Sequence, residues 1–523
     1  MRTRRIVVIG AGIGGLVAAL LLASRGFAVT VIESAATPGG KMREVAPNGA
    51  KIDAGPTVFT MRWVFDEILE EVGISSLSDR LTLLPIETLA RHAWRDGAKL
   101  DLFTDSDRSA DAIGAFAGSA EAEGYRQFCK RAGAIYDALR ETFIRASKPN
   151  PLTLVRRAGL RGLPSLVGIS PFTPLWGALE EHFRDQRLRQ LFGRYATYCG
   201  SSPFAAPATL MLVAHVEREG VWLVQGGMHR LAALLSNLAQ ERGVTFHYGR
   251  RAERILVENG RTCGLATEDG ELFAADAIVM NGDAAALGVG ALGEAAKQSE
   301  ARMRKAARSL SAVTWAINAR TSGFPLAHHN VFFSDEYRAE FEDIFSHNRL
   351  PRAPSVYVCA QDRDDDETPG ARVDAERLLC LVNAPPTGDE NAISASEFLS
   401  CEDTVFRFLA TCGLEIERDT RTTIRTTPQD FARLFPATGG ALYGRASHGW
   451  MASFARPGSR TRLPGLYLAG GSTHPGPGVP MAALSGRLAA QSVSEDLVST
   501  RLLSLAATSG GISTRSATTV VTD

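Results

Sequence analysis

A glycine-rich turn near the N-terminus constrains the fold of this chain more than any other feature. The run GAGIGG supplies Gly10, Gly12, Gly14 and Gly15, directly after the strand-like RIVVI and before the helix-like LVAALLL. Gly10 permits a tight turn, Gly12 lets the backbone approach a pyrophosphate, and Gly15 lets the helix pack on the strand. The free N–H groups at the start of that helix bind phosphates. The pattern therefore predicts a dinucleotide-binding turn.

An acidic residue at the end of the next strand supports this prediction. The expected strand 28–32 ends in Glu33, at close to the separation typical of an acid that binds both hydroxyls of an unphosphorylated ribose. The run 288–293 also reads GxGxxG, but the expected strand before it, 277–280, ends too early and the intervening residues look helical. We expect a Rossmann-type α/β domain with one dinucleotide site and no separate nicotinamide domain.

The residues after Glu33 indicate which dinucleotide is bound. The run PGGK contains Gly39, Gly40 and Lys41, and the run DAGPT ends in Thr57. The stretch resembles the flavoprotein family that includes amine oxidases, carotenoid desaturases and Rab-escort proteins. This resemblance implies FAD rather than NAD, with these four residues at the cofactor.

A second glycine-rich segment, 465–480, lies near the other end of the chain. Its sequence GLYLAGGSTHPGPGVP resembles the signature of bacterial-type phytoene desaturases, although Pro477 stands where that signature has a small residue. Pro480 suits the first turn of a helix that we expect to run to about Leu497. The positive end of that helix would favour reduced, negatively charged flavin. The resemblance places five residues against FAD: Gly470, Gly471, Gly478, Val479 and Met481.

A third segment completes the expected cofactor domain. A helix at 230–242 and a strand at 244–248 precede a hairpin that starts near Ala252. The resemblance implies that backbone groups near Ala252 hold the adenine, while an ordinary αβ extension without ligand contact stays an equal alternative. The FAD-binding domain is thus predicted to be discontinuous, at 1–72, 220–282 and 430–499.

Two insertions separate these segments. The first, 73–219, is expected to be a helical cap with helices at 107–142 and 175–198. The second, 283–429, is expected to be the substrate-binding domain, with strands at 312–319, 355–360 and 378–383 and a helix at 395–412. The resemblance implies a cavity with a sheet as its floor and helices as its cap. Residues 500–523, rich in Ser, Thr and Gly, are predicted to form a disordered tail.

Residues 162–179 carry no charge and contain three prolines, Phe172 and Trp176, and they follow three arginines. Prolines exclude a regular spanning helix, but such a segment suits a membrane interface. A packed cap is the equal alternative. The uncharged run after the N-terminal arginines is explained by the nucleotide-binding turn, so we expect no signal peptide or membrane anchor there.

Composition excludes several other classes of function. Lys plus Arg and Asp plus Glu each number 57, so no net field recruits nucleic acid. The seven cysteines form no CxxC pair, which fits a reducing cytoplasm and predicts no metal site. The adjacent His328 and His329 are expected to lie in a solvated loop. No GxSxG elbow with triad partners is present.

The segment 53–63 indicates a subtype. Phytoene desaturases commonly have Asp-Pro where this chain has Met61-Arg62, and the segment most resembles hydroxyneurosporene or methoxyneurosporene desaturases. That resemblance implies an FAD-dependent carotenoid desaturase that introduces the 3,4 double bond of an acyclic 1-hydroxy- or 1-methoxy-carotenoid by hydride transfer to flavin N5. The sequence does not identify a catalytic base, although Thr473 and His474 are the nearest candidates for contact with flavin or substrate.

Several alternatives and partners follow from the same resemblance. The enzymatic alternatives are a phytoene-type desaturase, a carotenoid isomerase and an amine oxidase. A non-catalytic prenyl- or lipid-binding escort protein on the same fold is the alternative from another class. We expect a quinone or dioxygen as electron acceptor, and a cytoplasmic protein held peripherally at the inner face of the membrane. The sequence does not predict the oligomeric state.

Overall fold

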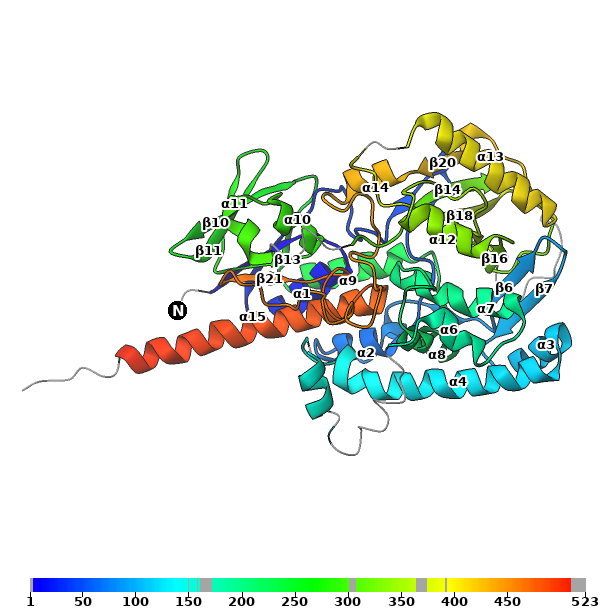
Figure 1. The fold of residues 1–523 in the computed structure, drawn as a ribbon. Coiled ribbons are helices and arrows are strands. Elements are labelled where there is room, and N and C mark those ends of the chain that lie inside the picture. The colour runs from blue at the N-terminus through cyan, green and yellow to red at the C-terminus, as the bar shows by residue number, and fades with distance from the viewer. Residues whose placement is uncertain are drawn as a thin grey trace, which may run out of the picture.

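A parallel five-stranded sheet is the first of two main sheets in the computed structural model (Figure 1). The structure describes residues 3–148, 150–157, 159, 172–300, 307–363, 374–390 and 393–508. The strand order is β21-β13-β1-β2-β9. Its strands are β1 (Arg5–Ile9), β2 (Ala28–Ile32), β9 (Thr245–His247), β13 (Ala277–Met280) and β21 (Leu466–Leu468). All three segments predicted for the FAD-binding domain therefore contribute strands to one sheet.

Three helices pack together on this sheet. Helix α1 (Ile13–Ser24) is buried from Ile13 to Leu22, because it is apolar on every side. It contacts both α9 (His229–Glu241) and α15 (Val479–Thr508). Helix α15 begins as predicted, with a proline in its first turn, but it continues to Thr508. The tail predicted from residue 500 thus overlaps the end of this helix, where neither glycine nor proline interrupts the sequence; residues 509–523 lie outside the described residues.

A small antiparallel sheet extends the first one. It consists of β10 (Ala252–Glu258), β11 (Arg261–Thr267) and β12 (Leu272–Ala274), which confirms the predicted hairpin. Strand β13 then ends at Met280, and helix α10 (Ala284–Val289) follows, with α11 (Glu294–Lys297) after it. The second GxGxxG run thus lies at the end of a helix, which confirms its rejection as a nucleotide-binding turn.

A mixed seven-stranded sheet lies beside the first, with strand order β20-β14-β18-β17-β16-β6-β7. Its strands are β6 (Thr88–Trp94), β7 (Lys99–Phe103), β14 (Ser311–Ala319), β16 (His329–Phe333), β17 (Val356–Ala360), β18 (Glu376–Ala384) and β20 (Thr423–Thr426). The three strands predicted in the substrate-binding domain are confirmed. Strands β6 and β7, however, come from the stretch predicted as a helical cap. They form a hairpin around Asp96-Gly97, a turn signal that the helical interpretation of this stretch missed.

Helices cover both faces of the seven-stranded sheet (Figure 1). Helix α13 (Ala395–Thr411), close to the predicted helix, packs with the outer face, near α14 (Pro428–Leu434), and α12 (Tyr337–Phe345) lies beside the sheet. The cap helices are α3 (Ser106–Ala117), α4 (Ser119–Leu139), α6 (Leu175–Glu180), α7 (Gln186–Gly193) and α8 (Leu212–Arg218). Both predicted long cap helices are therefore interrupted. The first breaks at Gly118, whose φ is 101°, and the second breaks where Asp185 caps α7.

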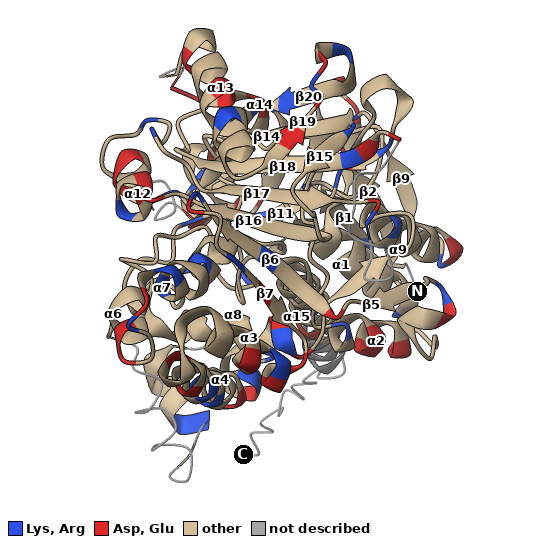
Figure 2. Ribbon diagram, turned by 90° about the vertical axis from the view of Figure 1, so that its right-hand side faces the viewer, with Lys and Arg blue, Asp and Glu red and all other residues tan. Residues whose placement is uncertain are grey.

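Short elements complete the fold. They are α2 (Trp63–Glu70) and the paired strands β3 (Glu44–Val45) with β4 (Ile52–Asp53), β5 (Leu83–Pro85) with β8 (Trp222–Val224), and β15 (Thr321–Gly323) with β19 (Leu414–Ile416). In Figure 2 the ribbon of α3 and α4 carries both blue basic and red acidic residues. Among the described residues, no helix combines the length and the apolar character needed to cross a membrane. Residues 162–171 of the predicted interfacial segment lie outside the described residues.

Candidate functional site

The two glycine-rich segments, far apart in sequence, meet in the structure. A Cβ placed on Gly14 would lie 2.7 Å from the Gly470 nitrogen and 3.0 Å from the Ala482 oxygen. A Cβ on Gly486 would lie 2.2 Å from the Gly14 oxygen. Helices α1 and α15 can therefore approach each other only because both carry glycine at this contact. The carboxyl edge of the parallel sheet thus brings both predicted cofactor turns together.

The N-terminal turn leaves the start of α1 open to a ligand. Gly10 has a φ of 94°, and a Cβ on Gly15 would lie only 2.1 Å from the Gly10 oxygen. Gly12 is the residue that precedes α1, and no side chain caps the helix there. Helix N–H groups without a capping side chain, at the positive end of the helix dipole, fit a phosphate.

Glu33 lies at the end of β2 beside this turn. Its side chain is buried, and it accepts hydrogen bonds from the Ala11 nitrogen at 2.6 Å and from the Ala35 nitrogen at 2.7 Å. These contacts fix the carboxylate. Its Oε1 accepts a second hydrogen bond from the Ser34 hydroxyl at 3.2 Å, while its Oε2 keeps a further lone pair for a ribose hydroxyl. The residue therefore lies where a dinucleotide would need it.

The segment from Gly39 to Lys41 packs against the same turn. The Gly39 nitrogen donates to the Ala11 oxygen at 2.9 Å, and a Cβ on Gly40 would lie 3.2 Å from the Cα of Gly12. The Lys41 ammonium donates to the Leu442 oxygen at 2.6 Å, and burial lowers the pKa of Lys41. The glycine-bearing segments at 10–15, 39–41 and 470–478 thus surround one space, which we call the cradle. Side chains would fill this space, and the glycines keep it open because they have no Cβ atom.

Ala252 lies close to the Glu33 end of this cradle. The Arg250 nitrogen donates to the Glu33 oxygen at 2.9 Å, and β10 begins two residues later at Ala252. The loop before β10 is therefore held next to the predicted ribose site.

A large cavity of about 550 Å³ begins where α15 starts and extends between the seven-stranded sheet and the cap helices. Thr57, Gly478, Val479 and Met481, four of the predicted site residues, line it. Most of its wall is apolar, and the apolar residues include Val58, Leu139, Phe143, Ile144, Leu210, Val213, Val216, Phe341, Val356 and Leu379. Such a cavity suits an elongated hydrophobic ligand.

The cavity reaches the surface through exposed hydrophobic residues. Val155, Phe172 and Trp450 all line the cavity, and all three are exposed, Phe172 by 72%. The Phe172 and Trp450 rings contact each other with centroids 5.1 Å apart. This opening is therefore ringed by side chains that water solvates poorly.

Two residues that shape the cradle were missed by the sequence interpretation. Arg456, 1% exposed, donates to the carbonyl oxygens of Tyr443, Gly471 and Arg445 and so ties the C-terminal turn to its neighbours. Nothing local in the sequence marks this arginine. Asn281 donates to the Gly10 oxygen at 3.3 Å, and its position after a buried parallel strand was an available signal.

His474 and Thr473, the predicted nearest candidates for contact with flavin or substrate, are both fully buried, and neither is among the residues that line the cavity. The His474 Nε2 donates to the Ala146 oxygen at 3.0 Å. Burial lowers the pKa of His474 to about 4, so the ring is neutral near pH 7. Its geometry is that of a residue that supports the turn.

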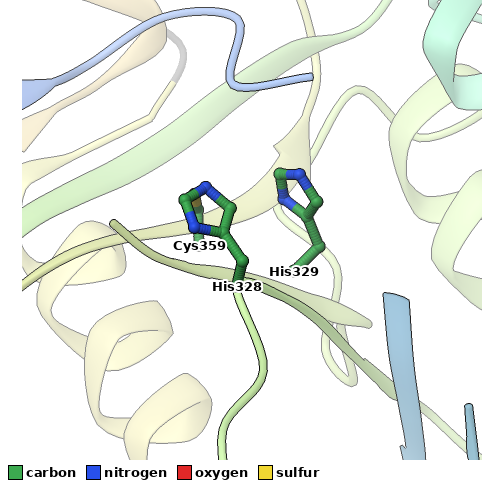
Figure 3. A group of neighbouring side chains, drawn as sticks. All are labelled: His328, His329 and Cys359. Carbon is green, nitrogen blue, oxygen red and sulfur yellow. The ribbon is translucent and has the colours of Figure 1, made fainter. Parts of the chain in front are cut away.

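His328 lies half-buried in the loop before β16, whereas His329 lies in the strand, so the prediction of a solvated loop is wrong for His329. His329 is buried at the start of β16, which pairs with β17 and β6 inside the sheet, and Cys359 lies beside both rings (Figure 3). Potential ligand atoms of the three residues lie within 4.8 Å of one another. Each has a protein partner, however: His328 bonds the Arg363 oxygen and the Cys359 sulfur, and His329 bonds the Tyr357 hydroxyl.

Burial also raises the pKa of Cys359 to about 12, whereas a metal requires the thiolate. The three side chains therefore form a hydrogen-bonded cluster in the core, and we assign no metal to them.

Comparison with known proteins confirms the predicted resemblance. A hydroxyneurosporene desaturase from Rubrivivax gelatinosus is 55% identical over 521 residues, covering 99% of this chain and 98% of the relative. A 1-hydroxycarotenoid 3,4-desaturase from a Flavobacterium species is 28% identical and covers 93% of this chain and 98% of the relative. The crystal structure of an oxidoreductase from Methanosarcina mazei, 17% identical, superposes with a TM-score of 0.60 over 94% of this chain and 100% of that one, which shows the shared fold.

The family model described as flavin containing amine oxidoreductase matches residues 13–494. This match confirms FAD as the cofactor and confirms the predicted flavoprotein fold. The match runs from the start of α1 through the C-terminal glycine-rich turn and covers more than half of the chain, so the chain belongs to the flavin-containing amine oxidoreductase family.

Proposed function

We propose that the protein is an FAD-dependent carotenoid desaturase that forms the 3,4 double bond of an acyclic 1-hydroxy- or 1-methoxy-carotenoid. One observation carries the proposal: a mainly apolar cavity of about 550 Å³ leads from exposed residues at the surface to the start of α15, where the two predicted cofactor turns meet. The names of the relatives supply the reaction class, and the cavity supplies a place for a polyene.

We propose that different residues of the cradle contact different parts of the cofactor. The start of α1, with Gly10, Gly12, Gly14 and Gly15, would hold the pyrophosphate, and Glu33 the ribose. Ala252 would face the adenine. The flavin end would lie against Gly39, Gly40, Lys41, Thr57, Gly470, Gly471, Gly478, Val479 and Met481. In this division 1–72, 220–282 and 430–499 form the cofactor unit, 283–429 the substrate-binding unit and 73–219 the cap.

The protein contributes mainly position and environment to such a reaction. FAD, when bound, supplies a hydride acceptor at N5. The apolar cavity wall holds the polyene extended and excludes water, so that the bond to be oxidised stays beside the cofactor. The start of α15 places the positive end of a helix dipole at that point, which favours negative charge there.

The exposed rim of the cavity also supports attachment to a membrane. Leu152, 78% exposed, and Met451 join Val155, Phe172 and Trp450 near the opening, and Arg156 and Arg157 are exposed beside them. Apolar side chains next to arginines suit the interface of an anionic bilayer. The opening would then face the lipid phase in which a carotenoid dissolves. We propose a quinone or dioxygen as the acceptor that reoxidises the cofactor.

The reaction is tested with purified protein, FAD and liposomes that contain 1-hydroxyneurosporene, with a quinone in one arm and air in another. Chromatography and absorption spectra should reveal a product with one more conjugated double bond. Unchanged pigment, an isomer of equal mass, or protein that takes up no FAD would contradict the proposal. Desaturation of phytoene alone would replace it with the phytoene-type alternative.

The membrane contact is tested by liposome flotation of a Phe172→Ser/Trp450→Ser double variant. Removing two exposed aromatic side chains should weaken partitioning by at least about tenfold, since each buried ring contributes roughly 1.5–3 kcal/mol. Leu272→Ser, at a side chain that is 67% exposed on β12, is the matched control and should partition like the unchanged protein. Equal partitioning of the double variant would refute the contact.

A further inference from the structure

We infer that Arg194 and Tyr198, together with the acidic groups facing them, bind the terminal oxygen of the substrate and thereby determine which carbon–carbon bond lies at the cofactor. This inference rests on the proposed function and identifies the part of the cavity that would select an oxygenated carotenoid over a pure hydrocarbon.

Arg194 is an unusual residue for a hydrophobic cavity. It begins the 3₁₀ segment Arg194–Cys199, is half-buried and lines the cavity. Its Nη1 donates to the Tyr198 hydroxyl at 3.3 Å, and its guanidinium carbon lies 5.2 Å from the centre of the Tyr357 ring. Among the described residues its hydrogen-bond partner is the Tyr198 hydroxyl, and no carboxylate lies within ion-pair distance of it. Most of its five N–H donors therefore have no acceptor among the described protein groups.

Glu217 and Glu340 lie near enough to offset part of the charge of Arg194, but neither accepts a hydrogen bond from it. Burying N–H donors of a cation without acceptors costs free energy, and a hydrocarbon ligand supplies no acceptor. In a protein that bound only hydrocarbon, an apolar residue at position 194 would be more stable than an arginine. The arrangement is consistent instead with a ligand that brings an acceptor oxygen to the guanidinium.

Acceptor groups for a hydroxyl proton line the same cavity. Glu217 accepts the Tyr195 hydroxyl and, at 3.3 Å, the Tyr198 hydroxyl. Glu340 accepts the Asn383 amide at 2.9 Å and the Ser355 nitrogen at 3.0 Å. A substrate hydroxyl both accepts and donates a hydrogen bond, so it can use Arg194 and one of these carboxyl groups together. A methoxy oxygen only accepts, so we expect hydroxylated substrates to bind more tightly than methoxylated ones.

The polar cluster adjoins the cofactor end of the cavity and not its opening. Tyr357 stacks beside Arg194, and its hydroxyl lies 2.7 Å from the Thr57 Oγ1 in the segment proposed to contact FAD. In a 1-hydroxy-carotenoid one carbon atom separates the oxygen-bearing carbon from the 3,4 bond. An oxygen held at this cluster would therefore place that bond, and no other, next to the cofactor.

The test compares two pigments that differ only in the terminal oxygen. 1-Hydroxyneurosporene and neurosporene are offered separately, in liposomes, to FAD-loaded protein carrying Arg194→Met or Tyr198→Phe. The control Thr209→Val removes a hydroxyl from another position of the cavity wall. We expect the unchanged protein to favour the hydroxylated pigment in kcat/KM and in equilibrium binding. Arg194→Met should reduce this preference by about tenfold or more and Tyr198→Phe by less, because hydrogen bonds to charged groups are the stronger ones. The control should leave it unchanged.

Several results would overturn the inference. One is an unchanged preference in both variants, and another is an equal loss for the two pigments, which a merely structural role would produce. If Arg194→Met does not fold, the nearly isosteric Tyr198→Phe still decides the outcome. The binding measurement separates the two proposals: a protein that binds the hydroxylated pigment preferentially but never oxidises it would retain the anchor and contradict the proposed reaction.

Discussion

The proposed cofactor side and the proposed substrate side of this molecule are built in different ways. On the cofactor side, residues that are near neighbours in sequence present backbone groups and empty space, as Gly12, Gly15 and Gly40 do around the start of α1. On the substrate side, the cavity wall is assembled from single side chains of separate elements, such as Arg194 and Tyr357. A local motif therefore encodes the first site, whereas only the tertiary fold assembles the second.

This difference has an energetic consequence. A glycine that allows two backbones to touch has no substitute, so changes on the cofactor side should act through the fold itself. A side chain that faces a cavity can be exchanged while the walls stay in place, so changes on the substrate side should alter selectivity first. The following predictions test this contrast, from the largest effect to the smallest.

The largest effect is expected for Gly15→Ala. The new Cβ would lie 2.1 Å from the Gly10 oxygen, so α1 cannot keep its contact with β1, and we expect a loss of more than about 4 kcal/mol in stability together with loss of FAD. Gly26→Ala, at the other end of the helix in open space, should cost only about 1–2 kcal/mol for its left-handed backbone. Urea unfolding and flavin content measure both variants. Equal losses would contradict the steric argument.

An intermediate effect is expected from acid, and it should be shared by both sides. His474 supports the cofactor turn and His92 lies in β6, and burial lowers the pKa of each to about 4. The unfolded chain binds these protons near pH 6.5, so the stabilisation is complete above pH 6.5 and is lost as the pH falls toward 4. At pH 5 the loss should reach about 2 kcal/mol for each residue.

Urea unfolding at pH 7 and pH 5 measures this loss. His474→Gln and His92→Gln should each remove their own part of the acid sensitivity, whatever either change costs at pH 7. An acid response that is the same in both variants as in the unchanged protein would show that other groups cause it.

The smallest of these effects is expected for Glu33→Gln. The change keeps one acceptor but removes the charge that strengthens its hydrogen bonds, so FAD affinity should fall about tenfold, or about 1.4 kcal/mol. Titration of the apoprotein by flavin fluorescence measures the change. Glu253→Gln, on the exposed face of β10, should have no effect, and neither should Tyr198→Phe on the substrate side. A loss of FAD affinity in Tyr198→Phe would contradict the expectation that changes on the substrate side leave the cofactor site unaffected.

The sequence predicted the cofactor side well because its signals are local. Strand, glycine turn, helix and terminal acid all lie between Arg5 and Glu33, and the structure has β1, α1 and β2 at the expected residues. Predictions for the cap were poorer. Gly118 breaks a helix that periodicity alone makes continuous, and the hairpin of β6 and β7 joins a sheet whose other strands follow more than two hundred residues later. His329 was predicted to be exposed to solvent because the residues next to it in sequence do not indicate which strands will cover it.

By itself the amino-acid sequence determined the nucleotide-binding turn, since that turn depends on short-range backbone geometry that consecutive residues must satisfy. The flavin and the family followed from the resemblance of the glycine-rich segments to known flavoproteins. The tertiary structure alone decided that Gly14 touches the Gly470 turn, that Arg456 ties this turn to its neighbours, and that Arg194 faces an apolar cavity beside Glu217. These contacts depend on the packing of elements hundreds of residues apart. The free energy of these contacts comes from burial and from close packing, and the spacing of residues along the chain predicts neither of them.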